Sequence, residues 1–236
     1  MKIFFFLPLL WSSICFSLSS PFDSSIPQVS IKNTHAVGEY DKIFRGQAPL
    51  GKVEELVEFG ITDILIFKNQ TKNEIDKEYI EINNKAAGLL NTHQINFQWH
   101  DYSSYQLACE QTIEALEYIR SIHFSLNKKL FFHCTVGEDR TGMLAGIWRI
   151  LSQGYSTKQA FYYEMCENGY GKGNPNKPAY VYNEIRSDLT PLYLYLANKI
   201  KTGKLSLRNL NTDICIDNIS RKHNLKCYTS SLFNNN

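Results

Sequence analysis

The sequence predicts an α/β domain in which helices flank a central, mostly parallel sheet. Short apolar runs typical of buried strands alternate along the chain with longer segments of helical spacing. The 236 residues are 43% hydrophobic and 13% aromatic, which is enough for one sizeable core. No internal repeat is visible, so the pattern does not favour a solenoid or a propeller.

Helices are predicted where apolar residues recur every three or four positions and a cap or a breaker marks an end. Gly60 ends the first helix, Asn73 or Asp76 starts the second, and Thr157 starts the fifth. Pro191 is expected to break the last helix, which then restarts. The predicted helices cover 53–59, 73–90, 109–122, 143–151, 157–167 and a segment that begins at Pro178.

Strands are predicted at 61–67, from its β-branched residues, at 95–99, from its alternation, and at 130–133, from its continuous apolar character. The third of these runs directly into a polar loop, and a helix follows the loop. Because parallel strands of such a sheet carry their functional loops at the carboxyl ends, we expect this loop to hold the site.

The loop after residue 133 carries a thiol at one end and a guanidinium at the other. Cys134 and Arg140 are separated by five residues, and the loop ends at a helix N-terminus, where free N–H groups and the helix dipole stabilise a phosphate or a thiolate. Thiols in such places beside a cation have pKa values of about 3.5–7.5. We therefore predict that Cys134 is a thiolate and that Arg140 holds a phosphoryl group with its planar fork.

The run His133-Cys134, five residues, then Arg140-Thr141-Gly142 resembles the signature loop of the cysteine-dependent phosphatases, the tyrosine and dual-specificity class. Residues 43–49 resemble the entry of the compact dual-specificity branch, so the likeness covers about 40–186. It implies a tyrosine/dual-specificity phosphatase-like fold and hydrolysis of phosphate monoesters through a cysteinyl-phosphate, with no metal or other cofactor. The alternative, a buried structural cysteine, leaves Arg140 and the loop glycines unexplained.

The resemblance also implies roles for individual residues. Thr141 hydrogen-bonds the thiolate, His133 orients the cysteine backbone, and Asp101 is the general acid that protonates the leaving oxygen. Asp139 is the competing acid, because some bacterial relatives with phosphoinositide or broad activity carry a functional aspartate there. The implied phosphate-binding residues are Thr135, Val136, Gly137, Glu138, Asp139 and Arg140, with Asn176 as a further supporting residue.

Several of these positions remain open between structural and functional interpretations. Thr141 can be only a helix cap, His133 a buried strand histidine, Asp101 a cap of its turn, and Asn176 part of a polar turn. Those bacterial relatives have lysine where this chain has Glu138, and a carboxylate there disfavours a polyanionic lipid substrate. Glu138 can instead point away and brace a neighbouring arginine. Arg45-Gly46-Gln47 is either a simple turn before a helix or a brace for the site.

The expected function is that of a protein tyrosine or dual-specificity phosphatase acting on a phosphorylated protein or a small phosphate ester. A phosphoinositide or inositol-phosphate phosphatase and an inactive phospho-binding module are the alternatives. Disulfide exchange is disfavoured because the chain has no Cys-x-x-Cys pair. The net charge of only +2 does not indicate a nucleic-acid partner.

The ends of the chain predict export and a solvated tail. Residues 1–20 read as a signal peptide: Lys2 precedes an apolar run that Pro8 interrupts and that is too short for a membrane span, and serines follow. We therefore expect a periplasmic or secreted protein. The expected parts are the signal peptide 1–20, an N-terminal extension 21–39, a catalytic domain 40–203 and a polar, basic tail 204–236, which is loose and contacts a membrane at most peripherally.

An oxidising compartment makes the remaining cysteines candidates for disulfides. The chain has six cysteines, of which Cys15 lies in the predicted signal peptide. If Cys134 stays free, four are left, and we expect Cys215 to pair with Cys227 across a short loop of the tail. Cys109 and Cys166 lie on predicted helix faces, where simple burial is at least as favourable as bonding. The Cys and His residues show no metal-ligand spacing.

Overall fold

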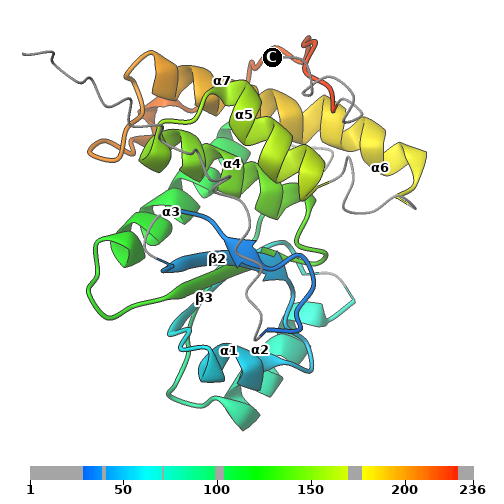
Figure 1. Cartoon of the computed structure of the whole chain (residues 1–236). Coiled ribbons are helices and arrows are strands. Elements are labelled where there is room, and N and C mark those ends of the chain that lie inside the picture. The colour runs from blue at the N-terminus through cyan, green and yellow to red at the C-terminus, as the bar shows by residue number, and fades with distance from the viewer. Residues whose placement is uncertain (1–28, 39–40, 71, 99–103, 170–176, 228–236) are drawn as a thin grey trace, which may run out of the picture.

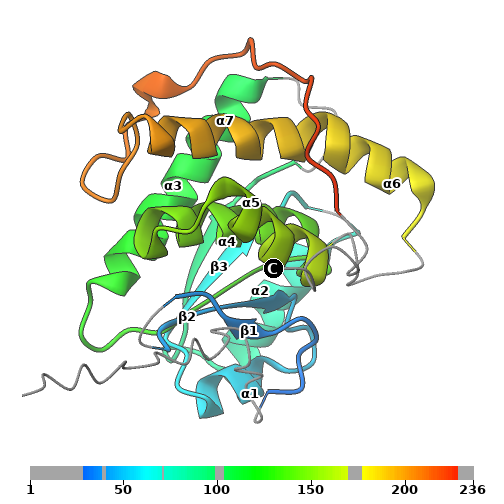
Figure 2. The ribbon, with the colours of Figure 1, turned by 45° about the horizontal axis from the view of Figure 1, so that its top comes forward.

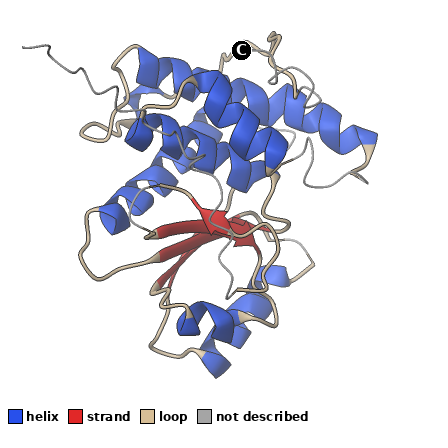
Figure 3. Ribbon diagram, in the orientation of Figure 1, coloured by secondary structure: helices blue, strands red, loops and turns tan. Residues whose placement is uncertain are grey.

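The computed structural model describes residues 29–38, 41–70, 72–98, 104–169 and 177–227, and it has the predicted α/β architecture (Figures 1 and 3). Its five-stranded sheet has the order β1-β2-β5-β3-β4. The last four of these strands are parallel, and only the short β1 at the edge is antiparallel. The strands are β1 (His35–Ala36), β2 (Ile43–Gln47), β3 (Asp63–Phe67), β4 (Asn91–Ile95) and β5 (Leu130–Cys134).

Helices cover both faces of the sheet (Figures 1 and 2). In β3, Ile64 and Ile66 pack with α1 and α2, while Leu65 and Phe67 belong to the larger core on the opposite face with α3, α4 and α7. The α-helices are α1 (Val53–Glu58), α2 (Glu74–Lys85), α3 (Tyr105–His123), α4 (Asp139–Gln153), α5 (Thr157–Phe161), α6 (Ala179–Glu184) and α7 (Thr190–Lys201), with π-helical turns η1 (Tyr162–Glu167) and η2 (Ile185–Leu189) and a 3-10 turn η3 (Thr212–Ile214).

The strand predicted at 95–99 lies four residues earlier, at Asn91–Ile95. It pairs with β3 from Asp63 opposite Asn91 to Phe67 opposite Ile95, at the edge of the sheet. An edge strand exposes polar side chains, so the apolar alternation that marks a strand is absent here. The apolar residues that suggested a strand at 95–99 lie at the end of β4 and just after it. Among them, buried Phe97 stacks on Phe67 with ring centroids 4.2 Å apart.

Pro191 does not break the last helix, contrary to the prediction. The helical path continues from α6 through the wider turn η2 into α7, with Pro191 in the first turn of α7. Proline lacks an N–H, so it cannot donate to the carbonyl of Ser187, four residues earlier. The Tyr105 hydroxyl donates to that carbonyl at 2.8 Å, which supplies the missing bond.

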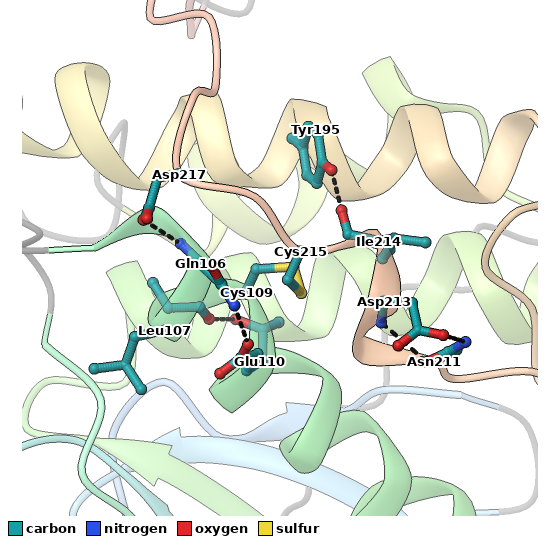
Figure 4. Close-up of a disulfide and its surroundings, with 12 residues drawn as sticks. Gln106, Leu107, Cys109, Glu110, Tyr195, Asn211, Asp213, Ile214, Cys215 and Asp217 are labelled. Atoms are coloured by element: carbon teal, nitrogen blue, oxygen red, sulfur yellow. Dashed lines mark hydrogen bonds between the residues drawn. A yellow bond between two sulfur atoms is a disulfide. The ribbon is translucent and has the colours of Figure 1, made fainter.

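The predicted pairing of Cys215 with Cys227 is wrong. Cys215 bonds Cys109 on α3 (Figure 4), and Cys227 bonds Cys166 in η1. These bonds span 106 and 61 residues and so constrain the unfolded chain more than a bond within the tail would; each contributes about 2–4 kcal/mol. In the described part of the chain, Cys134 alone is a free cysteine.

The described part of the tail is fastened to the domain rather than loose. Leu205, Leu210 and Cys215 are buried against the helices, and both tail cysteines are disulfide-bonded. A loose tail was expected because the tail is mostly polar, and its composition does not show that a few apolar residues and two cysteines attach it to the domain. The predicted signal peptide lies outside the described residues, and no described helix has the length and apolarity to cross a membrane.

Candidate active site

Cys134 is the last residue of β5, in the middle of the sheet. β5 pairs in parallel with β2 up to Gln47 opposite Cys134 and with β3 up to Ile66 opposite His133, so the backbone at Cys134 is fixed by the sheet. Its side chain is buried, with 2% of the residue exposed. The loop 135–138 then joins it to the N-terminus of α4, as the sequence predicts.

The carbonyl groups of the loop 135–138 all accept hydrogen bonds from outside the loop. The donors are Ala48 N to the Thr135 carbonyl at 3.3 Å, Asn33 Nδ2 to Val136 at 2.8 Å, and Arg45 to Gly137 and, at 3.3 Å, to Glu138. No acceptor among the described residues meets the backbone N–H groups of Val136, Gly137 or Glu138. Because the loop carbonyls are hydrogen-bonded to groups outside the loop, the N–H groups can donate to an oxyanion bound at the start of α4.

Arg45 is the brace behind this loop, and Arg45-Gly46-Gln47 is part of β2 rather than a turn. The side chain of Arg45 is fully buried. Besides the two loop carbonyls, it donates to the Glu164 carbonyl at 2.9 Å and to the Glu164 carboxylate at 2.6 Å. The loop conformation therefore depends on a charge pair that lies beneath it.

Glu164 is the buried centre of this support. Its carboxylate contacts Arg45, Arg149 and His35, and it lies in the π-helical turn η1. Burial raises the pKa of Glu164, but the opposing charges outweigh it and hold the pKa well below its usual range. Burial also lowers the pKa of His35, so this histidine is mostly neutral at neutral pH. The guanidinium groups of Arg45 and Arg149 are then the charges that keep the pKa of Glu164 low.

Arg140, in the first turn of α4, is fixed by contacts with three segments. Its guanidinium donates to Asn69 Oδ1 at 3.1 Å, to the Phe97 carbonyl at 3.4 Å and to Thr135 Oγ1 at 3.4 Å. Sequence reasoning missed Asn69. The available signal was its position just beyond β3, at the carboxyl edge of the sheet where site residues gather.

The surroundings of Cys134 favour a thiolate. Burial acts to raise the pKa of the thiol, but the charge of Arg140 and hydrogen bonds from Thr141 outweigh it and lower the pKa to about 7. The Thr141 hydroxyl is buried and has no other partner among the described residues. Its geometry supports the role that the family resemblance implies.

His133 lies under the loop in a fully buried pair with Glu78 of α2. Its Nε2 is 2.7 Å from Glu78 Oε1, and its Nδ1 is 3.0 Å from the Cys134 carbonyl. A carbonyl only accepts, so Nδ1 carries the proton in that contact. This contact orients the cysteine backbone, and Glu78 is a second supporting residue that the sequence pattern did not reveal.

Glu138 and Asp139 are both engaged by Lys177. The ammonium group lies 3.0 Å from Glu138 Oε2 and also bonds Asp139 Oδ1, and the lysine is almost fully buried. Glu138 thus braces a lysine and not an arginine. Burial raises the pKa of Glu138, and Lys177 opposes that effect.

Two predicted site residues, Asp101 and Asn176, lie outside the described residues. The remaining ones, from His133 to Thr141, form one continuous site at the carboxyl end of β5. No group of three or more His, Cys, Asp or Glu side chains suited to a metal ion occurs in the described segments.

Gly137 is required by the close approach of the loop to β2. It has φ +78°, and a Cβ built there would lie 2.3 Å from the carbonyl carbon and oxygen of Gly46. We expect Gly137→Ala to displace the loop, to reduce catalytic activity and to destabilise the fold by about 1–3 kcal/mol, measured by chemical denaturation.

Gly154→Ala is the matched control, because Gly154 also has positive φ, +69°, but nothing within 4 Å of its Cβ position. Gly154→Ala should lower the stability, because alanine is strained at positive φ, but it should leave the catalytic activity unchanged. Equal effects of the two substitutions on activity would contradict the close-approach argument.

The ionisation of Cys134 can be followed by the ultraviolet absorbance of the thiolate, taken as the difference between the wild type and Cys134→Ser. We expect a midpoint near pH 7. Arg140→Gln removes the neighbouring cation and should move the midpoint upward by about 1–3 pH units. A wild-type midpoint near the ordinary value of 9.0, or no response to Arg140→Gln, would refute the electrostatic account.

Comparison with known proteins adds a likeness in architecture. No protein-family model and no curated protein matches the chain. The core catalytic domain of the PP-IP phosphatase SIW14 from S. cerevisiae is 19% identical with a TM-score of 0.47, over 75% of this chain and 97% of that one. TpbA of P. aeruginosa is 18% identical with a TM-score of 0.48, over 72% and 92%.

The human tyrosine phosphatase-like serine/threonine/tyrosine-interacting protein is 14% identical with a TM-score of 0.45, over 73% of this chain and 98% of that one. At such identities and scores a likeness carries no conclusion about chemistry. The chain therefore resembles these solved structures in overall fold, and conclusions about its chemistry depend on the loop 134–141 itself.

Proposed function

We propose that this chain hydrolyses phosphate monoesters through a cysteinyl-phosphate, as a protein tyrosine or dual-specificity phosphatase. The observation that carries the proposal is the buried Cys134 thiol, whose pKa is lowered to about 7, in a loop that Arg140 closes. Within the described segments, the N–H groups of residues 136–138 meet no acceptor. A thiolate, an oxyanion nest and a guanidinium together suit attack on a phosphorus atom.

The reaction consists of two in-line displacements. The sulfur of Cys134 attacks phosphorus, the phosphorus–oxygen bond of the ester breaks, and a general acid protonates the leaving oxygen. The conjugate base of that acid then takes a proton from water, the water oxygen attacks the phosphocysteine, the sulfur–phosphorus bond breaks, and Thr141 stabilises the departing thiolate. The loop N–H groups and Arg140 stabilise the equatorial oxygens in both steps.

Asp101 is our proposed general acid, because the alternative, Asp139, is already engaged by Lys177. We expect Asp101→Asn to flatten the basic limb of the pH–rate profile and to slow substrates with poor leaving groups by about 10²–10⁴-fold. Asp139→Asn should leave that limb in place. The reverse pattern would transfer the role to Asp139.

Inositol phosphates and phosphoinositides are the second candidate substrates. Glu138 was expected to repel a polyanion, but buried Lys177, which it shares with Asp139, offsets part of the negative charge of the two carboxylates. This pairing weakens the main sequence argument against such substrates, and a substrate panel decides between the two classes.

Turnover of an aryl phosphate by the purified chain, and its inhibition by vanadate, test the proposal. Activity across phosphotyrosine, phosphoserine and inositol-phosphate substrates then decides the substrate class. Tight phosphate binding without any turnover would favour the phospho-binding module instead.

We also propose that the protein is exported. The apolar N-terminal run suggests a signal peptide, and two disulfides suit an oxidising compartment. Cell fractionation tests this, and a reduced protein retained with the cytoplasm would contradict it.

A further inference from the structure

A basic hollow of about 540 Å³ lies where the C-terminal tail crosses α6 and η2. Arg186 contributes from the helical wall, and Arg221 and Lys222 contribute from the tail. The other residues that line it are uncharged or histidine, so three cations meet around one small volume. In the sequence these three residues are far apart, one in a predicted helix and two in the polar tail, so their proximity was not predictable.

The cations of the hollow are largely unmatched. Arg186 and Lys222 are exposed, and no carboxylate of the described chain lies within ion-pair distance of either side chain. Arg221 reaches Asp188 only at 4.0 Å, and its guanidinium lies over the Tyr105 ring at 5.3 Å. The hollow therefore presents positive charge to whatever enters it.

Three contacts fix the tail wall of the hollow in place. His223 Nε2 lies 2.8 Å from the Arg186 carbonyl, which joins the two walls directly. The Cys166–Cys227 disulfide holds the tail just beyond the hollow. Just before it, Asp217 accepts hydrogen bonds from Ser104 and from Gln106, the second of which Figure 4 shows. The hollow is thus a built feature of the fold.

The hollow lies within reach of the candidate active site. Lys177 contacts Asp139 at one end of the loop 134–140, and α6 begins two residues after Lys177. Arg186 lies seven residues further along the helical path, a rise of about 10 Å beyond the two residues that lead into the helix. The tail crosses the junction of α6 and α7 (Figure 2). Its Arg221 contacts Tyr105, at the start of α3, the helix that leaves the same carboxyl edge of the sheet.

We propose that this hollow binds the acidic flank of a phosphopeptide whose phosphate occupies the loop 134–140. The inference rests on the proposed function and names its substrate class. An extended peptide advances about 3.3 Å per residue, so the span corresponds to about four residues. A shallow hollow with three cations fits one carboxylate or a second phosphate, whereas docking to a membrane surface needs a broader basic face.

The test compares two phosphotyrosine peptides that differ only in carrying glutamate or glutamine about four residues from the phosphotyrosine, on either side. For the wild type, kcat/KM should be about three- to tenfold higher for the glutamate peptide, mainly through KM. Arg186→Gln with Lys222→Gln should abolish the preference. Arg221 is left unchanged because it also supports Tyr105.

Arg208→Gln is the matched control, since Arg208 is an exposed cation of the same tail that does not line the hollow. It should keep the full peptide preference, and all variants should hydrolyse a plain aryl phosphate at the wild-type rate. Equal preference in the wild type and the double variant would overturn the inference. The inference would also be overturned if the double variant kept the peptide preference and lost only its binding to phosphatidylserine vesicles.

The two proposals fail in different ways. Absence of aryl-phosphate turnover by the wild type would refute the proposed function. Normal turnover without discrimination between the peptides would refute only the subsite. Replacing Cys166 and Cys227 by serine releases the tail wall, and it should weaken the preference while turnover of the aryl phosphate persists.

Discussion

Replacing Cys134 with serine is expected to abolish turnover of an aryl phosphate, by at least about four orders of magnitude. The serine hydroxyl does not ionise near neutral pH, so neither the Arg140 charge nor the Thr141 hydrogen bonds can make it a comparable nucleophile. The measurement is kcat under saturating substrate, with the wild type assayed in parallel.

The same variant should fold and bind phosphate normally, because oxygen replaces sulfur at a site whose surroundings are held by other residues. Its melting temperature and its affinity for inorganic phosphate are the controls. Substantial remaining turnover in a well-folded Cys134→Ser protein would show that another group is the nucleophile.

Replacing Glu164 with glutamine is expected to destabilise the protein by about 3–5 kcal/mol, because it leaves Arg45 and Arg149 buried without a countercharge. For a domain of this size that corresponds to a fall in melting temperature of about 6–20 °C. Activity should fall as well, since Arg45 would no longer be held against the carbonyls of Gly137 and Glu138. Thermal unfolding at neutral pH measures the first effect.

The pH dependence of this effect has a definite sign. The pKa of Glu164 is held below its ordinary value of 4.5, so its stabilising contribution is complete above that pH and is lost as the pH falls toward the folded-state value. The difference in stability between the wild type and Glu164→Gln should therefore shrink below about pH 4.5.

Glu114→Gln is the control for this experiment, because Glu114 also pairs with a histidine, His93, but is about half exposed. It should change the stability by less than about 1 kcal/mol. A similar cost for both substitutions would mean that burial of the Glu164 cluster does not control the stability.

The place of the candidate loop 134–141 between a strand and a helix could be predicted from sequence because its residues are contiguous. Cys134, Arg140 and Thr141 lie within eight positions, and the strand before them and the helix after them have strong local signals. The order of elements was predictable for the same reason. Edge strand β4 was misplaced because an exposed edge carries little apolar periodicity.

The support of the site was not predictable, because it joins residues that are far apart in sequence. Arg45 meets Glu164 across 119 positions, and Cys109 meets Cys215 across 106. A single sequence records no such pairing, and Glu164 reads as one polar residue in a helix. The short loop Cys215–Cys227 looked favourable only because the path of the tail over the helices was unknown.

The most direct test of the account is rapid-quench trapping of the enzyme during turnover of an aryl phosphate, followed by mass spectrometry of its peptides. The account predicts a phosphoryl group on the sulfur of Cys134 that forms before the second product appears and disappears as substrate is exhausted. Turnover with no adduct on Cys134, or an adduct on another residue, would contradict it.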